Sequence, residues 1–226
     1  MTLHAEQERS MRSLVLASSV GTVIEWYDFF LYGSLAIFFA RLFYPPGNDV
    51  AATLISVATF ATGFAVRPFG SLLFGYMGDS VGRKKTFLIT LLIMGCSTAA
   101  IGLLPTFATA GYLAPVLLIL LRIVQGLALG GEYGGAATYV AEHSPPGERG
   151  KWASYIQAMA SAGFVLSLGI VLTLRLWLGE DAFGTWGWRA PFLVSIVLVA
   201  VSLRIRLRLA ESPVFVEMHK QGQLSK

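Results

Sequence analysis

Long apolar stretches separated by short polar segments run along the chain from about residue 14 to residue 208. A helix that crosses a bilayer needs about 20 mostly apolar residues. Six stretches reach that length, and they cover residues 14–39, 52–76, 86–104, 113–139, 153–178 and 190–208. Proline, glycine and acidic residues fill the breaks, as in Tyr44-Pro45-Pro46-Gly47. The pattern predicts an all-α integral membrane protein with six transmembrane helices.

Two carboxylates, Glu25 and Asp28, interrupt the first apolar stretch near its middle. An acid at the centre of a membrane helix costs about 2.5–3.5 kcal/mol, so a partner or a function must offset that cost. At roughly 100° per residue, Gly21, Glu25, Asp28 and Tyr32 fall on one side of the helix. Two interpretations fit this stripe. It forms a structural ion pair with Arg67 or Arg122, or its acids bind and release a proton.

Charged residues of both signs remain inside the other predicted spans. The basic ones are Arg67, Arg122 and Arg175, and Glu132 joins the two acids of the first span. Buried charges persist in a bilayer when they pair or line a wet cavity. We therefore expect the first, second and fourth helices to meet at a polar centre. Arg175 lies near Glu180 and Asp181, which suits a pairing at the membrane surface.

The fourth span combines polar side chains with many glycines. Arg122 and Gln125 share a wide stripe of this helix, and Glu132 lies toward the Gln125 side. Small residues at this spacing allow a second helix to approach closely. The glycines concerned are Gly126, Gly130, Gly131, Gly134 and Gly135. We expect them to serve helix packing.

The composition supports a membrane protein and argues against several other classes. Hydrophobic residues make up 55% of the chain and charged residues 13%, with a mean hydropathy of +0.65. Soluble domains carry about 25% charged residues. One cysteine, Cys96, and three well-separated histidines, His4, His143 and His219, leave no disulfide or metal motif. The formal net charge is +4, but the basic residues lie between the apolar runs rather than on one polar face. Their placement therefore gives no indication of nucleic-acid binding.

The distribution of Lys and Arg predicts the orientation, because cytoplasmic loops are rich in both. One side holds Arg9, Arg12, Arg83, Lys84, Lys85, Arg149, Lys151, Arg204, Arg206, Arg208, Lys220 and Lys226. The other side holds Arg41 and Arg189. Both termini are therefore expected in the cytoplasm, in a multi-pass protein of the inner (plasma) membrane. We expect Arg204, Arg206 and Arg208 to reach lipid headgroups. The first span follows Arg9 and Arg12 and has no clear cleavage site, so we expect it to remain as an anchor.

The segment between the second and third spans reads Gly75-Tyr76-Met77-Gly78-Asp79-Ser80-Val81-Gly82-Arg83-Lys84-Lys85. Its glycines permit a tight turn, and Asp79 is placed to cap a helix N-terminus. The order of Gly, Asp, Gly, Arg and Lys resembles the signature of the major facilitator superfamily, Gly-x-x-x-Asp-Arg-x-Gly-Arg-Arg/Lys. The run from Leu121 to Gly126 similarly resembles the Arg-x-x-Gln-Gly motif of that superfamily, which is associated with proton coupling.

Further motifs resemble one branch of this superfamily, the metabolite:proton symporters of citrate, α-ketoglutarate, shikimate, proline or betaine. They are Glu25-Trp26-Tyr27-Asp28-Phe29, Gly130-Gly131-Glu132-Tyr133-Gly134-Gly135-Ala136, Glu142-His143-Ser144-Pro145 with Arg149-Gly150, and Glu211-Ser212-Pro213-Val214-Phe215. The resemblance covers nearly the whole chain. It implies a six-helix N-terminal half of a twelve-helix fold, built as a 3+3 inverted repeat.

Two features depart from the family pattern. Ser80 stands where the family usually has Arg or Lys, which removes one cationic contact from the cytoplasmic gate. The chain also ends after six spans. The resemblance thus implies domains at 1–13 (cytoplasmic N-terminus), 14–208 (transmembrane) and 209–226 (a cytoplasmic tail leading toward a missing second half). Either the sequence is truncated or two chains assemble.

The resemblance implies proton-coupled symport of a small organic acid or zwitterionic osmolyte by alternating access. The expected substrate and proton site comprises Glu25, Asp28, Tyr32, Arg67, Arg122, Gln125 and Glu132, and the expected gate comprises Gly75, Asp79, Gly82, Arg83 and Lys84. The expected partners are a small-molecule solute, the lipid bilayer and a second six-helix half or a second chain. The proton gradient is the driving force, and no cofactor is expected.

Two other classes of function and an inactive form remain as alternatives. An oligomeric membrane channel would also explain the polar stripe in the first span. A truncated remnant would insert into the membrane without transporting. An enzyme is disfavoured because the sequence has no His-Glu-x-x-His motif, Ser-His pairing or nucleophilic Cys.

Overall fold

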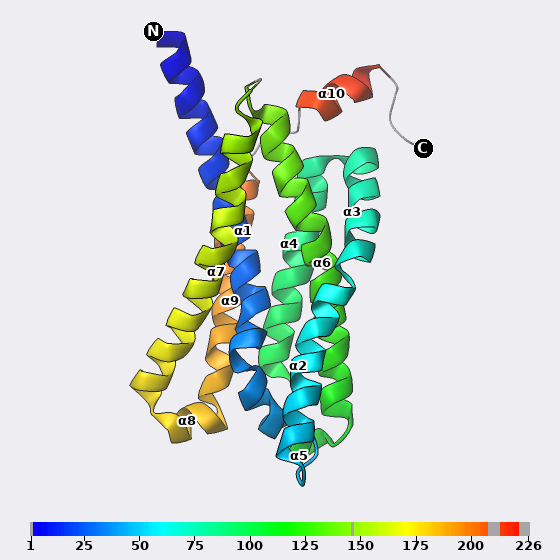
Figure 1. Cartoon of the computed structure of the whole chain (residues 1–226), viewed down its shortest axis with the longest axis vertical. Helices are drawn as coiled ribbons and strands as arrows, with labels where there is room; N and C mark the ends of the chain where they lie inside the picture. Colours follow the sequence, from blue (N-terminus) through cyan, green and yellow to red (C-terminus); the bar gives the residue numbers. More distant parts are fainter. Residues whose placement is uncertain (1, 146, 208–212, 222–226) are drawn as a thin grey trace.

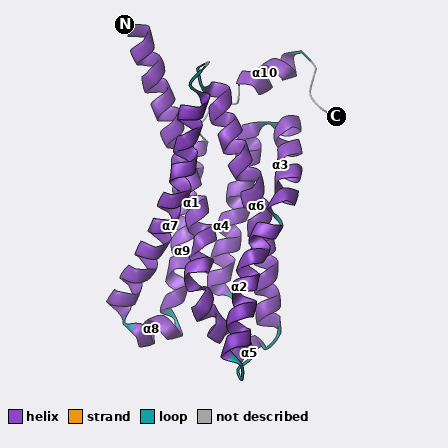
Figure 2. Ribbon diagram, in the orientation of Figure 1, coloured by secondary structure: helices purple, strands orange, loops and turns teal. Residues whose placement is uncertain are grey.

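The computed structural model describes residues 2–145, 147–207 and 213–221, and the regular structure of these residues is helical throughout (Figures 1 and 2). The α-helices are α1 (Thr2–Phe43), α2 (Asp49–Ala65), α3 (Arg67–Val81), α4 (Arg83–Leu103), α5 (Phe107–Ala110), α6 (Leu113–His143), α7 (Arg149–Leu178), α8 (Glu180–Thr185), α9 (Ala190–Arg206) and α10 (Pro213–Lys220). A short 3₁₀ helix, η1 (Gly187–Arg189), precedes α9.

Six helical segments of the described chain are long and apolar enough to cross a membrane. They are Val20–Phe43, Asp49–Val81, Arg83–Leu103, Leu113–His143, Arg149–Leu178 and Gly187–Arg206. Each overlaps one predicted span, so the predicted number of spans is confirmed. The helices extend beyond several predicted limits. In particular, α1 begins at Thr2, within the segment predicted as a separate N-terminus.

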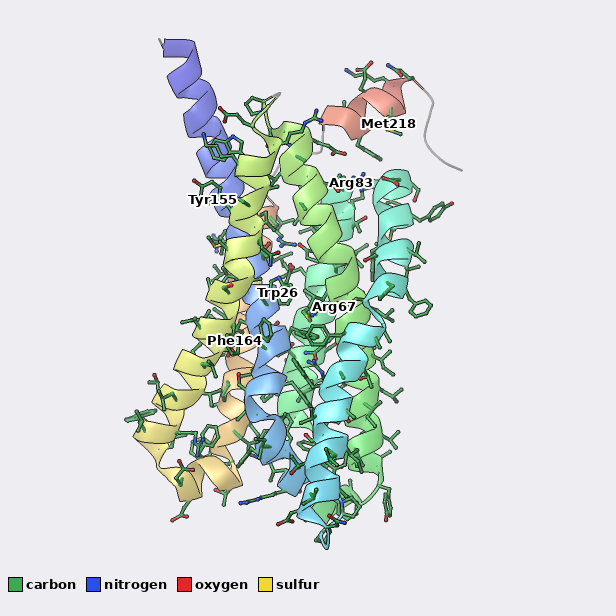
Figure 3. The ribbon with its side chains drawn as sticks, viewed as in Figure 1. Trp26, Arg67, Arg83, Tyr155, Phe164 and Met218 are labelled. Carbon is green, nitrogen blue, oxygen red and sulfur yellow. The ribbon has the colours of Figure 1, made fainter. Side chains whose placement is uncertain are left out.

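The second span is broken in its middle, which differs from the continuous helix predicted at 52–76. Helix α2 ends at Ala65 and α3 begins at Arg67. Pro68 follows at once, and a proline inside a helix lacks the N–H for the hydrogen bond to the preceding turn. The break at Val66 therefore has a local cause in the sequence. It places the half-buried side chain of Arg67 at the start of a new helix, about halfway along the bundle (Figure 3).

The long helices form one bundle with its connections at two ends (Figure 1). Helix α1 packs against α7, α2, α9 and α6, while α4 packs against α6 and α9. The start of α1, the α3–α4 turn and α10 lie at one end, and α5 and α8 lie at the other. Helices α1, α4, α6 and α9 thus surround the buried interior in which the polar side chains are found.

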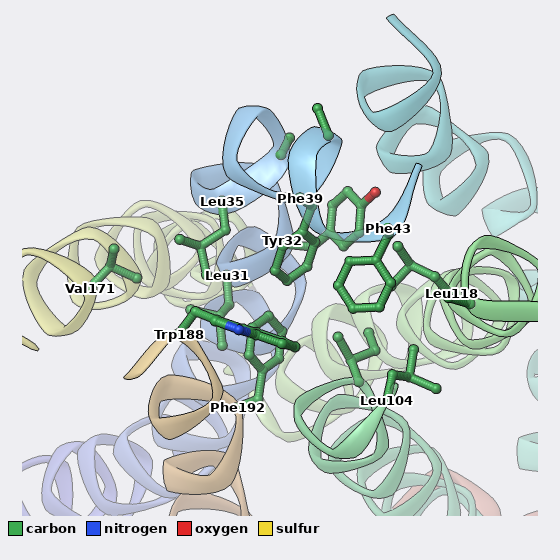
Figure 4. Close-up of a cluster of buried hydrophobic side chains, with 14 of the residues drawn as sticks. Leu31, Tyr32, Leu35, Phe39, Phe43, Leu104, Leu118, Val171, Trp188 and Phe192 are labelled. Atoms are coloured by element: carbon green, nitrogen blue, oxygen red, sulfur yellow. The ribbon is translucent and has the colours of Figure 1, made fainter. Parts of the chain in front are cut away.

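An aromatic core fills the half of the bundle nearest α5 and α8. Figure 4 shows Tyr32, Phe39, Phe43, Trp188 and Phe192 packed among leucines. The ring of Phe39 lies 5.5 Å from that of Trp188 and 5.6 Å from that of Phe192, between ring centroids. Aromatic pairs at such distances attract one another beyond the effect of their buried area, so these contacts fix α1 against α9.

Glycine allows the broken second span to lie directly on α6. A side chain on Gly126 would collide with the backbone of Gly63 in α2, and one on Gly130 would collide with the backbone of Arg67. The predicted role of these α6 glycines in close packing is confirmed at these two positions. The contact brings Arg67 and Arg122 to neighbouring positions in the interior.

Candidate functional site

Two guanidinium groups flank the ring of Phe29 in the middle of the bundle. The Cζ atom of Arg67 lies 4.3 Å from the centre of this ring, and the Cζ atom of Arg122 lies 4.5 Å from it. Arg67 also lies over Phe64, at 4.1 Å, and over Trp26, at 4.8 Å (Figure 3). Aromatic faces attract cations while leaving their hydrogen-bond donors available. Among the side chains that the structure describes, Nε and Nη2 of both arginines have no hydrogen-bond partner.

Arg122 is held in place from its own helix and from α1. Its Nη1 donates to Oε1 of Gln125 at 2.7 Å and to the carbonyl oxygen of Phe29 at 3.4 Å. Gln125 in turn donates from Nε2 to Thr98 Oγ1 on α4, at 2.7 Å. Arg122 and Gln125 are both fully buried. The fourth-helix pair predicted from the sequence therefore forms one hydrogen-bonded unit.

Asp28 is 1% exposed and points into the same interior from α1. Within the described residues, neither oxygen of its carboxylate has a hydrogen-bond partner. The hydroxyl groups of Thr98 and Ser195 are its polar neighbours, and Thr98 links it to the Gln125 side chain. Of the two interpretations of the stripe, the ion pair with Arg67 or Arg122 is not formed at this acid. A buried carboxylate with no cationic partner is costly, which makes Asp28 a candidate for protonation.

Tyr32 lies one turn beyond Asp28 and closes the site on the side of the aromatic core. Its hydroxyl donates to the carbonyl oxygen of Ser56 on α2, at 3.2 Å. Its ring lies 4.7 Å from the Cζ atom of Arg122. Tyr32, a member of the expected substrate and proton site, thus directs its hydroxyl to α2.

Glu25 and Glu132 bind a partner that the sequence did not predict. Arg206 Nη2 lies 2.7 Å from Oε1 of Glu25, and Arg206 Nη1 lies 2.5 Å from Oε1 of Glu132. The Thr90 hydroxyl donates to the other Glu132 oxygen at 2.5 Å. Arg206 is 3% exposed, so the prediction that it reaches lipid headgroups is wrong. The polar interior therefore includes α4 and α9 as well as the predicted helices.

A periodic signal in the sequence could have identified Arg206. The buried positions of α9 include Ser195, Val199, Ser202 and Arg206. These spacings of three and four residues follow one helix face. Arg204, two residues earlier, falls on another face and is exposed. Its contact with lipid headgroups stays a prediction. Arg208, Glu211 and Ser212 lie outside the described residues.

The predicted gate residues gather at the end of the bundle where α3 turns into α4. Arg83 Nη2 lies 2.8 Å from Asp79 Oδ1 and 3.6 Å from Glu142 Oε1 on α6. Lys84 donates to the carbonyl oxygen of Leu207 at 2.9 Å. Asp79 lies inside α3 rather than at a helix N-terminus, so its predicted capping role is wrong. Gly82 makes the turn with a φ of 114°, a conformation that side chains disfavour.

The remaining predicted residues, Gly75 and Arg175, lie away from the buried polar centre. Gly75 lines a pocket of about 170 Å³ between α3, α4 and α6. Arg175 pairs with Glu180 at 2.6 Å in an exposed position, as predicted from their proximity. In the described part of the chain, we find no group of three or more His, Cys, Asp and Glu side chains placed to hold a metal ion.

Comparison with known proteins gives one family and a consistent set of relatives. The family model "Sugar (and other) transporter" matches residues 14–226. The inner membrane metabolite transport protein YhjE of Escherichia coli K12 is 48% identical over 97% of this chain and 51% of its own length. The shikimate transporter of the same organism is 42% identical over 95% of this chain and 50% of its own length. The proline/betaine transporter of Salmonella typhimurium is 42% identical over 94% of this chain and 43% of its own length.

The solved structures that resemble the chain have the major facilitator fold. The proton:xylose symporter XylE, bound to 6-bromo-6-deoxy-D-glucose, superposes with a TM-score of 0.83 at 18% identity. The match covers 96% of this chain and 48% of that one. A partially occluded, inward-open form of XylE from E. coli gives a TM-score of 0.79 at 22% identity. The chain thus spans about half the length of the relatives and structures that it matches.

Proposed function

The chain belongs to the sugar (and other) transporter family of the major facilitator superfamily, and we propose that it forms one six-helix half of a proton-coupled symporter for a small carboxylate-bearing solute. It is a multi-pass membrane protein, and the proteins of this family are transporters rather than enzymes. The coupling ion, the solute and the second half are the parts that we propose.

The pair of arginines around Phe29 carries the proposal for the solute. Arg67 and Arg122 point two guanidinium groups into the interior, and neither contacts a carboxylate among the described residues. Guanidinium binds carboxylate through two parallel hydrogen bonds. Shikimate, proline and betaine, the solutes named for the relatives, each carry a carboxylate. A solute carboxylate would therefore accept hydrogen bonds from the N–H groups of Arg67 and Arg122 that have no partner among the described residues.

We assign proton binding for the coupled step to Asp28. Its carboxylate is buried beside Thr98, which is hydrogen-bonded to Gln125 and so connects it to the Arg122 unit. When the solute cavity opens to water, Asp28 can ionise, and when the cavity closes, the neutral form is favoured because a lone buried charge is costly. Thr98 and Gln125 would thus connect the solute-binding group, Arg122, with the proton-binding group, Asp28.

Alternating access needs a second six-helix unit that faces this one across the solute. The Arg83–Asp79–Glu142 contacts lie at the end of the bundle where such a unit would meet the α3–α4 turn. We propose that this end is cytoplasmic, because Arg83, Lys84 and Lys85 gather there while Arg41 and Arg189 lie toward the other end. The second unit is either a further segment of the same protein or another chain.

Uptake by proteoliposomes tests this function. The chain would be reconstituted alone, and also fused in frame to the second half of the YhjE protein, with radiolabelled shikimate, proline and glycine betaine as solutes. We expect uptake by the fusion when the outside is more acidic than the inside, and its loss when a protonophore removes the gradient. An oligomeric channel would instead conduct solute with no dependence on the gradient. Absence of gradient-driven uptake of every carboxylate solute, in a folded fusion, would contradict the proposal.

A further inference from the structure

The cluster of Glu25, Arg206 and Glu132 lies apart from the arginines of the solute site. Two carboxylates from α1 and α6 contact one guanidinium from α9, and all three side chains are 2–3% exposed. The chain provides space for this contact, because a side chain on Gly21 would collide with the Arg206 guanidinium. The cluster is therefore a built feature of the helix packing rather than a chance contact.

The charges in this cluster do not balance. Two ionised carboxylates around one guanidinium leave one negative charge in excess, in a setting that desolvates each ion at a cost of several kcal/mol. The charged groups that face Glu25 are Arg206, Glu132 and, one turn along α1, Asp28. Helix α4 presents the hydroxyl of Thr90, and α7 has no titratable side chain between Tyr155 and Arg175. No further cation in the described surroundings offsets the excess.

The two carboxylates differ in their contacts. Glu132 forms an ion pair with Arg206 through Oε1 and accepts a hydrogen bond from Thr90 at Oε2. Glu25 contacts Arg206 through Oε1, while its Oε2 has no hydrogen-bond partner in the part of the chain that the structure describes. The carboxyl groups of Glu25 and Glu132 both contact the Arg206 guanidinium, so they lie near one another. A proton on Glu25 would remove the repulsion between two neighbouring carboxylates.

We propose that this cluster is a second proton-binding site, separate from Asp28, in which Glu25 holds one proton while Glu132 and Arg206 stay ionised. The proton is delivered from the aqueous phase by hydronium, which becomes water, and it forms an O–H bond on Glu25; the cluster is then neutral. The site does not depend on the proposed solute or on transport, because it follows from the contacts within this six-helix unit.

A route for exchange of this proton lies beside the cluster. The glycine-lined pocket of about 170 Å³ between α3, α4 and α6 is bordered by Phe87. The centre of the Phe87 ring lies 5.5 Å from the Arg206 Cζ atom. The backbone carbonyl oxygen of Phe87 accepts a hydrogen bond from Arg206 Nη1 at 3.3 Å. One aromatic side chain thus borders both the pocket and the buried cluster. Rotation of Phe87 would admit water from the pocket to the cluster.

Infrared spectroscopy of the purified chain in lipid nanodiscs tests the proposal. Protonated carboxylic acids absorb at higher frequency than carboxylates, so their C=O band can be measured at neutral pH. In the Asp28→Asn background, which removes the other candidate acid, we expect one such band. We expect Glu25→Gln to remove it completely. Glu132→Gln should also remove it, because Glu25 then ionises to balance Arg206.

Glu180→Gln is the matched control, since this exposed glutamate also pairs with an arginine. It should leave the band unchanged. Thermal unfolding gives a second measurement, in which Glu25→Gln should match the control, because Gln resembles the protonated acid in size and charge. The proposal is overturned by absence of the band in the Asp28→Asn protein, by its persistence after Glu25→Gln, or by a large loss of stability in Glu25→Gln.

Discussion

Arg206 binds Glu25 at 2.7 Å and so joins the last spanning helix of the bundle to the first. This pairing decides the role of the other buried arginines. Because Arg206 also contacts Glu132, both glutamates are occupied by one cation. Arg67 and Arg122 are then left against aromatic rings, with donors that no described acid uses. A separate helix thus supplies the counter-ion, and the arginines at the bundle centre can serve a solute.

Arg122→Ala should weaken solute binding much more than Arg175→Ala in the fusion protein. Loss of a hydrogen bond to a charged group costs about 1.5–3 kcal/mol, which corresponds to roughly a 10- to 150-fold rise in KM for uptake. Arg175 forms an exposed pair with Glu180, and such pairs contribute about 0–1 kcal/mol. Equal effects of the two substitutions on KM would show that Arg122 does not contact the solute.

Asp28→Asn should uncouple solute uptake from the pH gradient. The substitution keeps the size of the side chain and removes its ability to exchange a proton. We expect gradient-driven accumulation to be lost while solute equilibration down its own gradient persists, as measured in the same proteoliposomes with and without a pH difference. Glu180→Gln, at an exposed pair with Arg175, is a comparison that leaves Asp28 and the gate contacts intact. Unchanged accumulation by Asp28→Asn would remove this residue from the coupling step.

Gly21→Ala should destabilise the bundle by displacing Arg206. An added methyl group at this position would collide with the guanidinium, and overpacking typically costs about 1–3 kcal/mol. Gly169→Ala in α7 is the control, because an added Cβ there meets nothing within 4 Å and alanine favours helices. Thermal unfolding in detergent would compare the two proteins. A midpoint for Gly21→Ala equal to or above that of Gly169→Ala would contradict the close packing of Arg206 on this glycine.

Tyr44 should make the thermal stability of the protein decrease at alkaline pH. Its hydroxyl shares a 2.6 Å hydrogen bond with Thr59 Oγ1, and burial raises the pKa of Tyr44 above its usual value of 10.0. A raised pKa in the folded state favours folding below pH 10, and this contribution is lost as the pH rises above it. Unfolding midpoints of the wild type and Tyr44→Phe should therefore differ by a constant amount below pH 10, and the difference should shrink above it. A difference that is independent of pH would contradict the assignment.

Apolar length predicted the six spans correctly, because the bilayer fixes the length of each helix. The break at Val66 was missed, although Pro68 carries a local signal for it. The depth of Arg206 was missed for a different reason. Its neighbour Arg204 is exposed, and a count of charges by loop cannot separate two residues on opposite faces of one helix end.

Within the candidate site, the sequence identified the buried acids and the Arg122–Gln125 unit, but neither arginine that it offered as an ion-pair partner contacts these acids. Glu25 and Asp28 share a stripe of α1, yet Glu25 contacts Arg206 and Asp28 contacts no arginine. Which acid meets which base depends on how α9 packs beside α1. That packing joins residues far apart in the chain, so helix periodicity alone could not reveal it.

The interruption at Val66 divides the second span into two helices, α2 and α3, which pack against different sets of neighbouring helices. Helix α3 packs on α6 and α4, while α2 packs on α1 and α6, and the two are separated by a break at Val66 next to Pro68 rather than joined in a continuous helix. A tilt of α2 could therefore occur while α3 and the charged turn beyond it stay in place. Arg67 sits at the pivot of that motion, so its guanidinium could change direction without travelling along the membrane normal.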